Sequence, residues 1–238
     1  MIPSNTRPAD ALDSRGARQR AVAHVKRAHV LAAARTAFFE LGLDGASMRE
    51  IAKRAGYTPG AIYSYFTSKE DIYAALLGES LERLNASVAA ALPVRARGTP
   101  AAEALHAAAT AFFDFFRENP RDLDLGFYLF QGMRPRGLTP ALNERLNARL
   151  RDALAPTANA LLALGWGAAG AQAETTALFA HAVGLLVLSH TGRIRMFRQE
   201  SQALFEQYLV ALLARAPRAP RAPAPRTPAR PRPRKAAA

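Results

Sequence analysis

Helix start and stop signals follow one another so closely between residues 42 and 68 that only very short helices fit between them. Gly42 and Gly56 can each end a helix, because glycine adopts a positive φ at little cost. Ser47 and Glu50 form a capping-box pattern, in which each side chain accepts a hydrogen bond from the backbone N–H of the other residue. These signals predict a helix of about two turns, a glycine turn and a second short helix.

The second short helix is predicted to begin with Thr58 and Pro59. A hydroxyl N-cap followed by proline at the first helical position is a typical start, since proline has no N–H to leave unpaired there. Ile62 and Phe66 are four residues apart and are expected to face the core, so the helix should end near residue 65 or 66. The short first helix carries the small residue Ala52 where the two helices must cross.

Longer helices are predicted on either side of this pair. Residues 24–41 place apolar side chains at helical spacing and end at Gly42. Ser68, which is followed by a lysine and two acids, is expected to cap a helix that continues to about residue 91. The same spacing argument predicts further helices at about 101–118, 121–131, 140–164, 171–191 and 198–214.

The sequence as a whole predicts an all-α protein with an N-terminal three-helix helix-turn-helix head and a C-terminal six-helix regulatory and dimerisation bundle. Half of the residues are apolar, alanine is abundant and β-branched residues are few, which favours helix over strand. The expected divisions are a flexible arm (1–20), a DNA-binding domain (21–77), a ligand-sensing and dimerisation domain (78–214) and a disordered basic tail (215–238).

The second short helix has the features of a DNA recognition helix. It would enter the major groove, where hydroxyl groups can bind phosphates or base edges, and small residues allow close approach. Ser47, Arg49 and Lys69 lie at neighbouring helix starts, where they can bind phosphate. The predicted DNA-binding residues are Ser47, Arg49, Thr58, Pro59, Gly60, Ala61, Tyr63, Ser64, Tyr65 and Lys69.

The stretch from Phe38 to Tyr73 resembles the N-terminal head of the TetR family of bacterial regulators. The resemblance implies a helical homodimer on a pseudo-palindromic operator, paired through its last two helices, and repression relieved by an unknown small molecule. It places the recognition positions at Thr58, Pro59, Gly60, Tyr63, Ser64 and Tyr65. Residues 179–184 also resemble the Trp-x-x-x-His-Gly motif of one group of C-terminal regulator domains, with Phe179 and Val183 in place of the tryptophan and histidine.

A cluster of aromatic residues covers more than one face of the predicted helices after residue 101. One interpretation is a ligand pocket between these helices, and the other is a plain core and subunit interface, with His181 as an ordinary packed histidine. The expected pocket residues are Phe112, Phe116, Phe127, Phe130, Met133, His181 and Leu185.

Charge and residue types exclude several other functions. The net charge is +13, but eight of the basic residues lie between Arg215 and the C-terminus, so charge alone does not identify a DNA binder. The tail suggests an alternative, a ligand-independent or architectural DNA-binding protein that relies on counterion release. The absence of cysteine excludes disulfides and thiolate chemistry. We expect no enzyme, cofactor, metal site or membrane span, and a location in the bacterial cytoplasm at the nucleoid.

Overall fold

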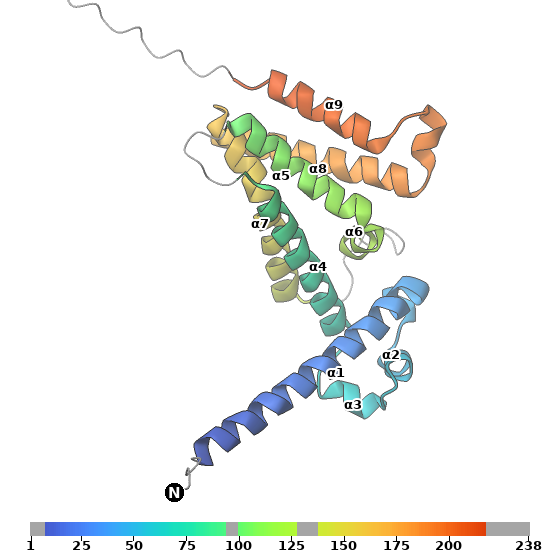
Figure 1. The fold of residues 1–238 in the computed structure, drawn as a ribbon. Coiled ribbons are helices and arrows are strands. Elements are labelled where there is room, and N and C mark those ends of the chain that lie inside the picture. Colours follow the sequence, from blue (N-terminus) through green and yellow to red (C-terminus); the bar gives the residue numbers. More distant parts are fainter. Residues whose placement is uncertain (1–7, 94–99, 128–137, 218–238) are drawn as a thin grey trace, which may run out of the picture.

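The computed structural model describes residues 8–93, 100–127 and 138–217, and within these ranges it contains helices and no strand. This confirms the all-α class. A small head and a larger helical body share the helix α4 (Figure 1). The elements are α1 (Pro8–Gly45), α2 (Met48–Ala55), α3 (Pro59–Tyr63), α4 (Lys69–Ala91), α5 (Ala101–Glu118), α6 (Pro120–Phe127), α7 (Pro140–Ala163), α8 (Ala168–His190), the 3₁₀ helix η1 (Arg193–Phe197) and α9 (Ser201–Ala214).

The head forms where the sequence predicts its boundaries. Gly42 has a φ of 72° and interrupts α1, and Gly56 has a φ of 73° at the end of α2. The Ser47 hydroxyl accepts a hydrogen bond from the Glu50 N–H at 3.1 Å, as expected. The reciprocal half of the predicted capping box was wrong, because the Glu50 carboxylate accepts a hydrogen bond from Arg54 Nε at 2.7 Å instead.

The N-terminal end of the chain differs from the expected arm. The structure extends α1 back to Pro8, so residues 8–20 are helical where an irregular arm of residues 1–20 was predicted. Residues 17–26 are all exposed, so no amphipathic pattern marks this part of the helix in the sequence. Alanine and arginine have high helix propensity, which lets a helix begun in the head continue without a packing partner. Residues 1–7 lie outside the described residues.

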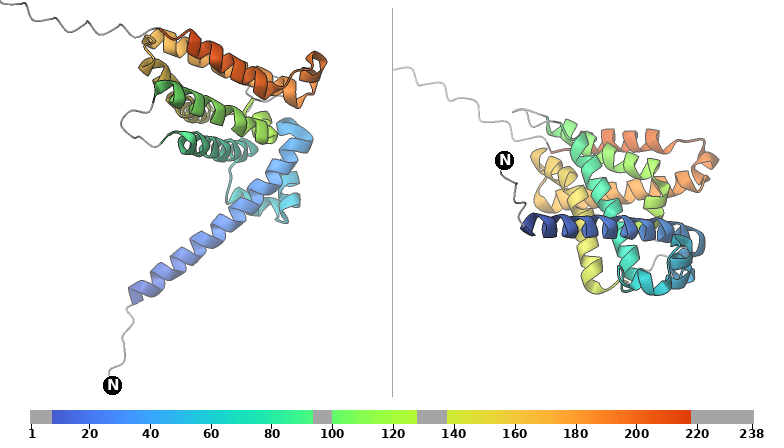
Figure 2. Two further views of the ribbon diagram at one scale, coloured as in Figure 1. Left: turned by 45° about the horizontal axis from the view of Figure 1, so that its top comes forward. Right: turned by 60° about the horizontal axis from the view of Figure 1, so that its bottom comes forward.

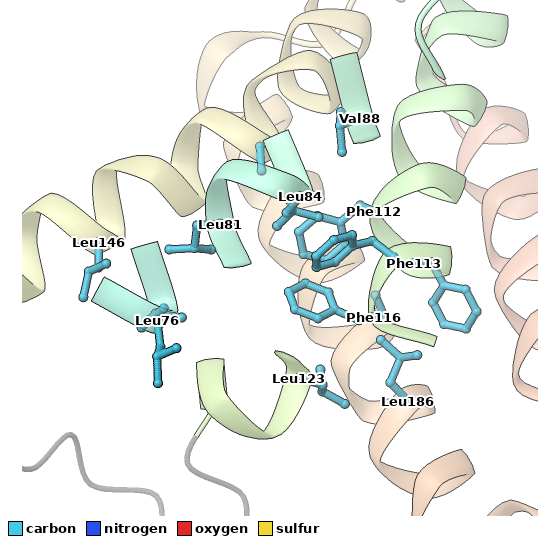
Figure 3. Close-up of a cluster of buried hydrophobic side chains, with 14 of the residues drawn as sticks. Leu76, Leu81, Leu84, Val88, Phe112, Phe113, Phe116, Leu123, Leu146 and Leu186 are labelled. Atoms are coloured by element: carbon cyan, nitrogen blue, oxygen red, sulfur yellow. The ribbon is translucent and has the colours of Figure 1, made fainter. Parts of the chain in front are cut away.

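Helix α5 is the centre of the body and contacts α4, α6, α7 and α8. Its four phenylalanines are all buried, although they cannot lie on a single stripe of the helix. Figure 3 shows that Phe112, Phe113 and Phe116 point in different directions. Phe112 lies edge-on to Phe179 of α8, and Phe113 stacks on Phe205 of α9 with ring centroids 4.3 Å apart. The ring of Phe116 is edge-on to Phe127 of α6.

Helices α8 and α9 lie side by side at the edge of the body farthest from α3 (Figures 1 and 2). α8 is long and apolar enough to cross a membrane by length and composition alone, yet only 33% of its most apolar stretch is buried. Of the predicted tail, residues 215–217 are described, and Arg215 lies 3.0 Å from Glu174 of α8, so the tail does not start as an unattached segment. Residues 218–238 lie outside the described residues.

Candidate nucleic-acid interface and ligand cavity

Helix α3 presents one face to the head core and the other to solvent. The Thr58 hydroxyl accepts a hydrogen bond from the Ala61 N–H at 3.3 Å, and Pro59 occupies the first turn. Ile62 is fully buried and Phe66 is 4% exposed, so both face the core as predicted. This anchoring fixes which side of α3 faces outward.

The outward face of α3 carries most of the predicted DNA-binding residues. Tyr63 is 55% exposed, and Ser64 is exposed while its hydroxyl donates to the Ala61 carbonyl at 2.7 Å. The other exposed members are Ser47, Arg49, Thr58, Pro59 and Gly60. Tyr63 and Pro59 line one shallow surface hollow together with Ser47, Arg49 and Lys69. The structure therefore brings the two predicted groups of contacts, at α2 and at α3, to one surface.

The remaining predicted residues are less available. Ala61 and Tyr65 are half-buried, and Tyr65 packs against the hydrophobic core, so only part of its side chain is accessible to DNA. The Lys69 ammonium donates to the carbonyls of Leu43 at 2.7 Å and Ala46 at 3.3 Å. The ammonium therefore satisfies carbonyls at the end of α1, a position that favours a cation. Lys69 also lines the hollow beside Tyr63, and its contact with phosphate stays a prediction.

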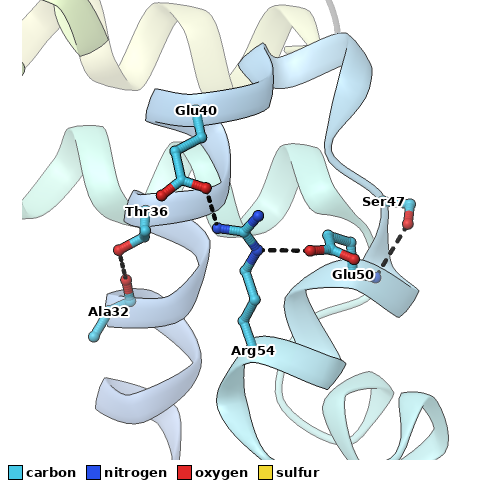
Figure 4. A network of polar contacts seen from close by, with 6 residues as sticks. All are labelled: Ala32, Thr36, Glu40, Ser47, Glu50 and Arg54. Atoms are coloured by element: carbon cyan, nitrogen blue, oxygen red, sulfur yellow. Dashed lines mark hydrogen bonds and ion pairs between the residues drawn. The ribbon is translucent and has the colours of Figure 1, made fainter.

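Arg54 joins two helices of the head, a role that the sequence alone did not predict. Its guanidinium lies 2.6 Å from the Glu40 carboxylate of α1 and 2.7 Å from that of Glu50 in α2, so it ties the two helices together (Figure 4). Hydrogen bonds to Glu40 and then Glu50 raise the pKa of Arg54 above its ordinary value. The i,i+4 spacing to Glu50 was visible in the sequence. The contact with Glu40 depends on the crossing of α1 and α2.

The body contains a partly open cavity of about 220 Å³ between α4, α5, α6 and α7. Its wall is apolar except at a few polar side chains. The lining residues are Leu77, Ser80, Leu81, Phe116, Asp122, Gly126, Phe127, Leu138, Asn143, Leu146, Asn147 and Leu150.

The predicted pocket residues fall in three places. Phe116 and Phe127 line the cavity, as expected. Phe112, His181 and Leu185 do not: Phe112 packs on Phe179, and the His181 ring stacks on Tyr208 of α9 with centroids 4.3 Å apart. Of the predicted aromatic residues, those that do not line this cavity fill space between helices. Phe130 and Met133 lie outside the described residues.

One buried carboxylate joins the cavity wall to the head. Asp122 of α6 lies 2.6 Å from Arg83 of α4 and 3.5 Å from Arg35 of α1. Beside it, the guanidinium of Arg121 lies over the Phe39 ring of α1, 4.5 Å from its centroid. The same short helix therefore borders the cavity and touches α1. Among the described residues, no group of three or more histidines and acids is placed to hold a metal ion.

Comparison with known proteins finds relatives of the head. Residues 30–76 match the family model described as bacterial regulatory proteins, tetR family. The chain is 35% identical over 102 residues to the HTH-type transcriptional activator FasR of Mycolicibacterium smegmatis, which covers 43% of this chain and 45% of that protein. It is 35% identical over 65 residues to the HTH-type transcriptional repressor AcnR of Corynebacterium diphtheriae, 27% of this chain and 34% of that protein. The chain thus matches less than half the length of these relatives.

Solved structures share the fold of head and body over about four fifths of the chain. A bacterial regulatory protein in the tetR family from Rhodococcus RHA1 superposes with a TM-score of 0.63 at 21% identity, covering 82% of this chain and 98% of that one. The regulator FadR from Bacillus subtilis, in complex with stearoyl-CoA, gives a TM-score of 0.55 at 20% identity, covering 79% and 97%. At these identities the likeness shows the arrangement of head and body.

Proposed function

Because this chain belongs to the TetR family of bacterial regulators, we propose that it is a transcriptional regulator that binds a specific operator through α3 and is released from it by a small molecule. The observation that carries the DNA-binding role is the outward face of α3, where Tyr63, Ser64 and Gly60 stand exposed on a helix fixed by Ile62. Hydroxyl groups and small residues on a short capped helix suit a base edge or a phosphate. The family is one of regulators, which supports a non-enzymatic role in the bacterial cytoplasm, at the nucleoid.

A homodimer through α8 and α9 completes the proposed regulator. A helix that is apolar all round is usually buried all round, yet the outer face of α8 is exposed and uncharged. The exposed residues of α8 are Ala168, Ala169, Gln172, Ala173, Thr176, Ala177, Ala180, Gly184 and His190, and those of α9 are Gln202, Ala203, Gln207, Val210, Ala211 and Ala214. A second copy packed on this surface would bury both faces. Two-fold symmetry would then place two heads on half-sites about 34–36 Å apart, or a multiple of this distance.

The cavity supports a small-molecule effector with a mainly apolar body. Leucines and phenylalanines form most of its wall, and Ser80, Asn143 and Asn147 offer hydrogen bonds at a few points. FadR of Bacillus subtilis is crystallised with stearoyl-CoA, so a long-chain acyl compound is a reasonable first probe. A ligand shifts an equilibrium only through different affinities for two states. The ligand that releases the protein from its operator should therefore bind more tightly to the state in which the two heads cannot reach both half-sites.

The sign of regulation is taken as repression. The relatives include an activator and a repressor by name, so similarity alone does not choose between them. A regulator that covers its operator and leaves it on ligand binding represses by occupying the DNA, and it needs no additional contact with the transcription machinery.

Selection from a pool of random duplex DNA tests the DNA-binding role. The purified protein, a variant truncated after Ala214 and the variant Tyr63→Ala are each used to retain DNA near physiological salt, and the retained DNA is sequenced. The proposal predicts a palindrome enriched by the full-length and truncated proteins and lost with Tyr63→Ala. Retention without a motif, abolished by truncation, would instead establish the alternative, a DNA-binding protein that depends on its basic tail.

The ligand role has its own test on the selected operator. Stearoyl-CoA is titrated into the complex of protein and operator, with the variant Gly126→Leu as the control. Gly126 lines the cavity, and a Cβ there would lie 3.9 Å from Leu77 Cδ1, at ordinary contact distance, so a leucine side chain should occupy part of the cavity. Release from the native protein but not from the variant supports the cavity as the effector site. Equal release from both proteins would place the ligand elsewhere.

A further inference from the structure

A groove between α7 and α8 lies beside the cavity and has no part in the proposed function. Its volume is about 410 Å³. Most of its wall is apolar, and the apolar side chains come from Leu150, Leu154, Ala155, Ala158 and Phe179. The groove is open to solvent along α7, since Ala155 is exposed. It therefore offers an apolar surface outside the cavity.

The cavity and the groove share part of their wall. Asn147 and Leu150, three positions apart on α7, line both of them. The ring of Phe127 lines the cavity and the ring of Phe179 lines the groove, and their centroids are 5.7 Å apart. Asn147 is exposed, so both hollows reach the surface beside it. The two hollows therefore meet at the same stretch of α7.

The cavity alone is small for a ligand. Ligand pockets commonly measure about 300–1,000 Å³, whereas the cavity measures about 220 Å³. A methylene group is similar in size to a water molecule, which occupies about 30 Å³ in the liquid, so the cavity holds about seven methylene groups. The cavity and the groove taken together have the volume of an ordinary ligand pocket.

The two hollows differ in the polar groups that they offer. In the cavity, the carboxylate of Asp122 is buried and already paired with two arginines. At the groove, Arg151, Gln172 and Thr176 are exposed, and Arg151 also pairs with Glu144. Burying a polar group without a partner is unfavourable. The polar end of a ligand is therefore favoured in the groove, where it stays in contact with water, and the apolar end is favoured in the cavity.

We propose that the effector is a linear amphiphile whose apolar chain fills the cavity and continues past Asn147 and Leu150 into the groove, where its polar end lies. This inference rests on the proposed function for the cavity as the effector site. The shared wall favours a ligand over a second copy of the chain as the occupant of the groove. Such a ligand contacts α6 through Phe127 and α8 through Phe179, so it links the helix next to the head with the helix of the proposed dimer surface.

Binding of fatty acids of two chain lengths tests the proposal in the absence of DNA. The cavity alone can hold the chain of octanoate, whereas tetradecanoate also needs the groove. Each acid is used below its micelle concentration and is compared with its coenzyme A thioester. Isothermal titration calorimetry gives the dissociation constants for the native protein and for Ala155→Trp, which places a ring in the groove and not in the cavity. The matched control is Ala89→Trp, at an exposed position of α4.

The affinity should rise with chain length only while the groove is free. Each buried methylene group raises affinity by about fourfold, so tetradecanoate should bind the native protein at least about a hundredfold more tightly than octanoate. Ala155→Trp should lower the affinity for tetradecanoate by at least about tenfold and leave that for octanoate within about twofold. Ala89→Trp should change neither. Gly126→Leu, in the cavity, should weaken both.

Several results would overturn the proposal. Equal affinity of the native protein for the two chain lengths would do so without depending on any variant. A loss in Ala155→Trp that is the same for both chains, or no loss at all, would leave the groove to a second copy of the chain. Absence of binding by both acids and both thioesters would exclude this class of ligand. If the expected pattern is found, the tighter of the free acid and the thioester identifies the head group.

The outcome is separable from that of the proposed function. Ligand binding is measured without DNA, so failure to select an operator does not affect it. If tetradecanoate binds across both hollows but does not release the operator, the inference stands and the proposed release is wrong. Release of the operator by a compact ligand, with no gain in affinity from a longer chain, would support the proposed function and overturn the inference.

Discussion

The Asp122 carboxylate in the cavity wall lies 3.5 Å from the guanidinium of Arg35 in α1. The side chain of Asp122 is 6% exposed and that of Arg35 is 32% exposed, so the pair is partly shielded from solvent. A change in the position of α6 on ligand binding would lengthen this contact and free α1. The ion pair is therefore a direct physical link between the proposed effector site and the head.

Arg35→Gln should weaken this link without unfolding the protein. Arg83 keeps its 2.6 Å contact with Asp122 in this variant, so the free energy of unfolding should fall by only about 1 kcal/mol. Asp122→Asn removes the acid that both arginines share, although Arg35 keeps its 3.7 Å contact with Glu79, and it should cost about 2–3 kcal/mol, less than a fully buried pair because both arginines are partly exposed. Urea denaturation measures both values. The control is Arg151→Gln, which removes an exposed ion pair with Glu144. If this control lowers the free energy of unfolding as much as Arg35→Gln does, Arg35 behaves as an ordinary surface residue.

Two glycines of the head should respond to alanine in opposite ways. Neither has an atom within 4 Å of an added Cβ, but Gly56 has a φ of +73°. Gly56→Ala should therefore lower the free energy of unfolding by about 1–2 kcal/mol. Gly60→Ala should raise it by about 0.5–1 kcal/mol, because alanine is the better helix residue, while the new methyl group on the DNA-facing surface weakens operator binding. Thermal denaturation and operator titration of both variants measure these effects. A change in stability of the same sign in both variants would contradict the prediction.

Gly184→Arg should separate dimerisation from folding. Gly184 is exposed on α8 with no atom within 4 Å of an added Cβ, so the protomer has room for the side chain. A charged group at the centre of an apolar interface would prevent a second copy from packing there. Analytical ultracentrifugation should show a folded monomer with native helical content. Ala89→Arg, at an exposed position of α4, is the matched control and should stay dimeric; a dimeric Gly184→Arg would place the interface elsewhere.

His181 should make the stability depend on pH. Burial lowers the pKa of His181 below its ordinary 6.5, against an opposing hydrogen bond with the Leu204 backbone. The unfolded chain then binds a proton more readily than the folded protein, so stability is complete above pH 6.5 and is lost as pH falls toward the folded-state pKa. Urea denaturation at pH 7.5 and 5.5 measures the loss, which should shrink in His181→Phe, a variant that keeps the stack on Tyr208. His24→Gln, at an exposed position, is the control. If His181→Phe loses as much stability between pH 7.5 and 5.5 as this control does, the pH dependence comes from other groups.

The sequence predicts the parts of this fold that local signals control. The caps at Ser47, Thr58 and Ser68 and the glycine stops lie at their expected positions, because each depends on residues a few positions apart. The contact between the Lys69 ammonium and the Leu43 carbonyl could not be predicted from the sequence, because the two residues are 26 positions apart and become neighbours only when α1 meets α4.

The position of the cavity could not be predicted from sequence patterns for a similar reason. Aromatic side chains suggested a pocket, but rings such as Phe112 and Phe113 fill the spaces around a central helix. The space that remains open is lined mostly by leucines that look like any other core residue, such as Leu81 and Leu146. Whether apolar side chains fill a core or border a void depends on how helices from distant parts of the chain pack together.

The most direct test of the central claim is the ratio of affinities for the selected operator and for an unrelated duplex of equal length, measured at one salt concentration with the native protein and with Tyr63→Ala. Specific regulators typically favour their site by at least about 10³-fold. If α3 reads the sequence, the native protein should show a ratio of this order, and Tyr63→Ala should show a ratio close to one with its affinity for the unrelated duplex unchanged. A ratio near one in the native protein, or an unaltered ratio in Tyr63→Ala, would contradict sequence reading by α3.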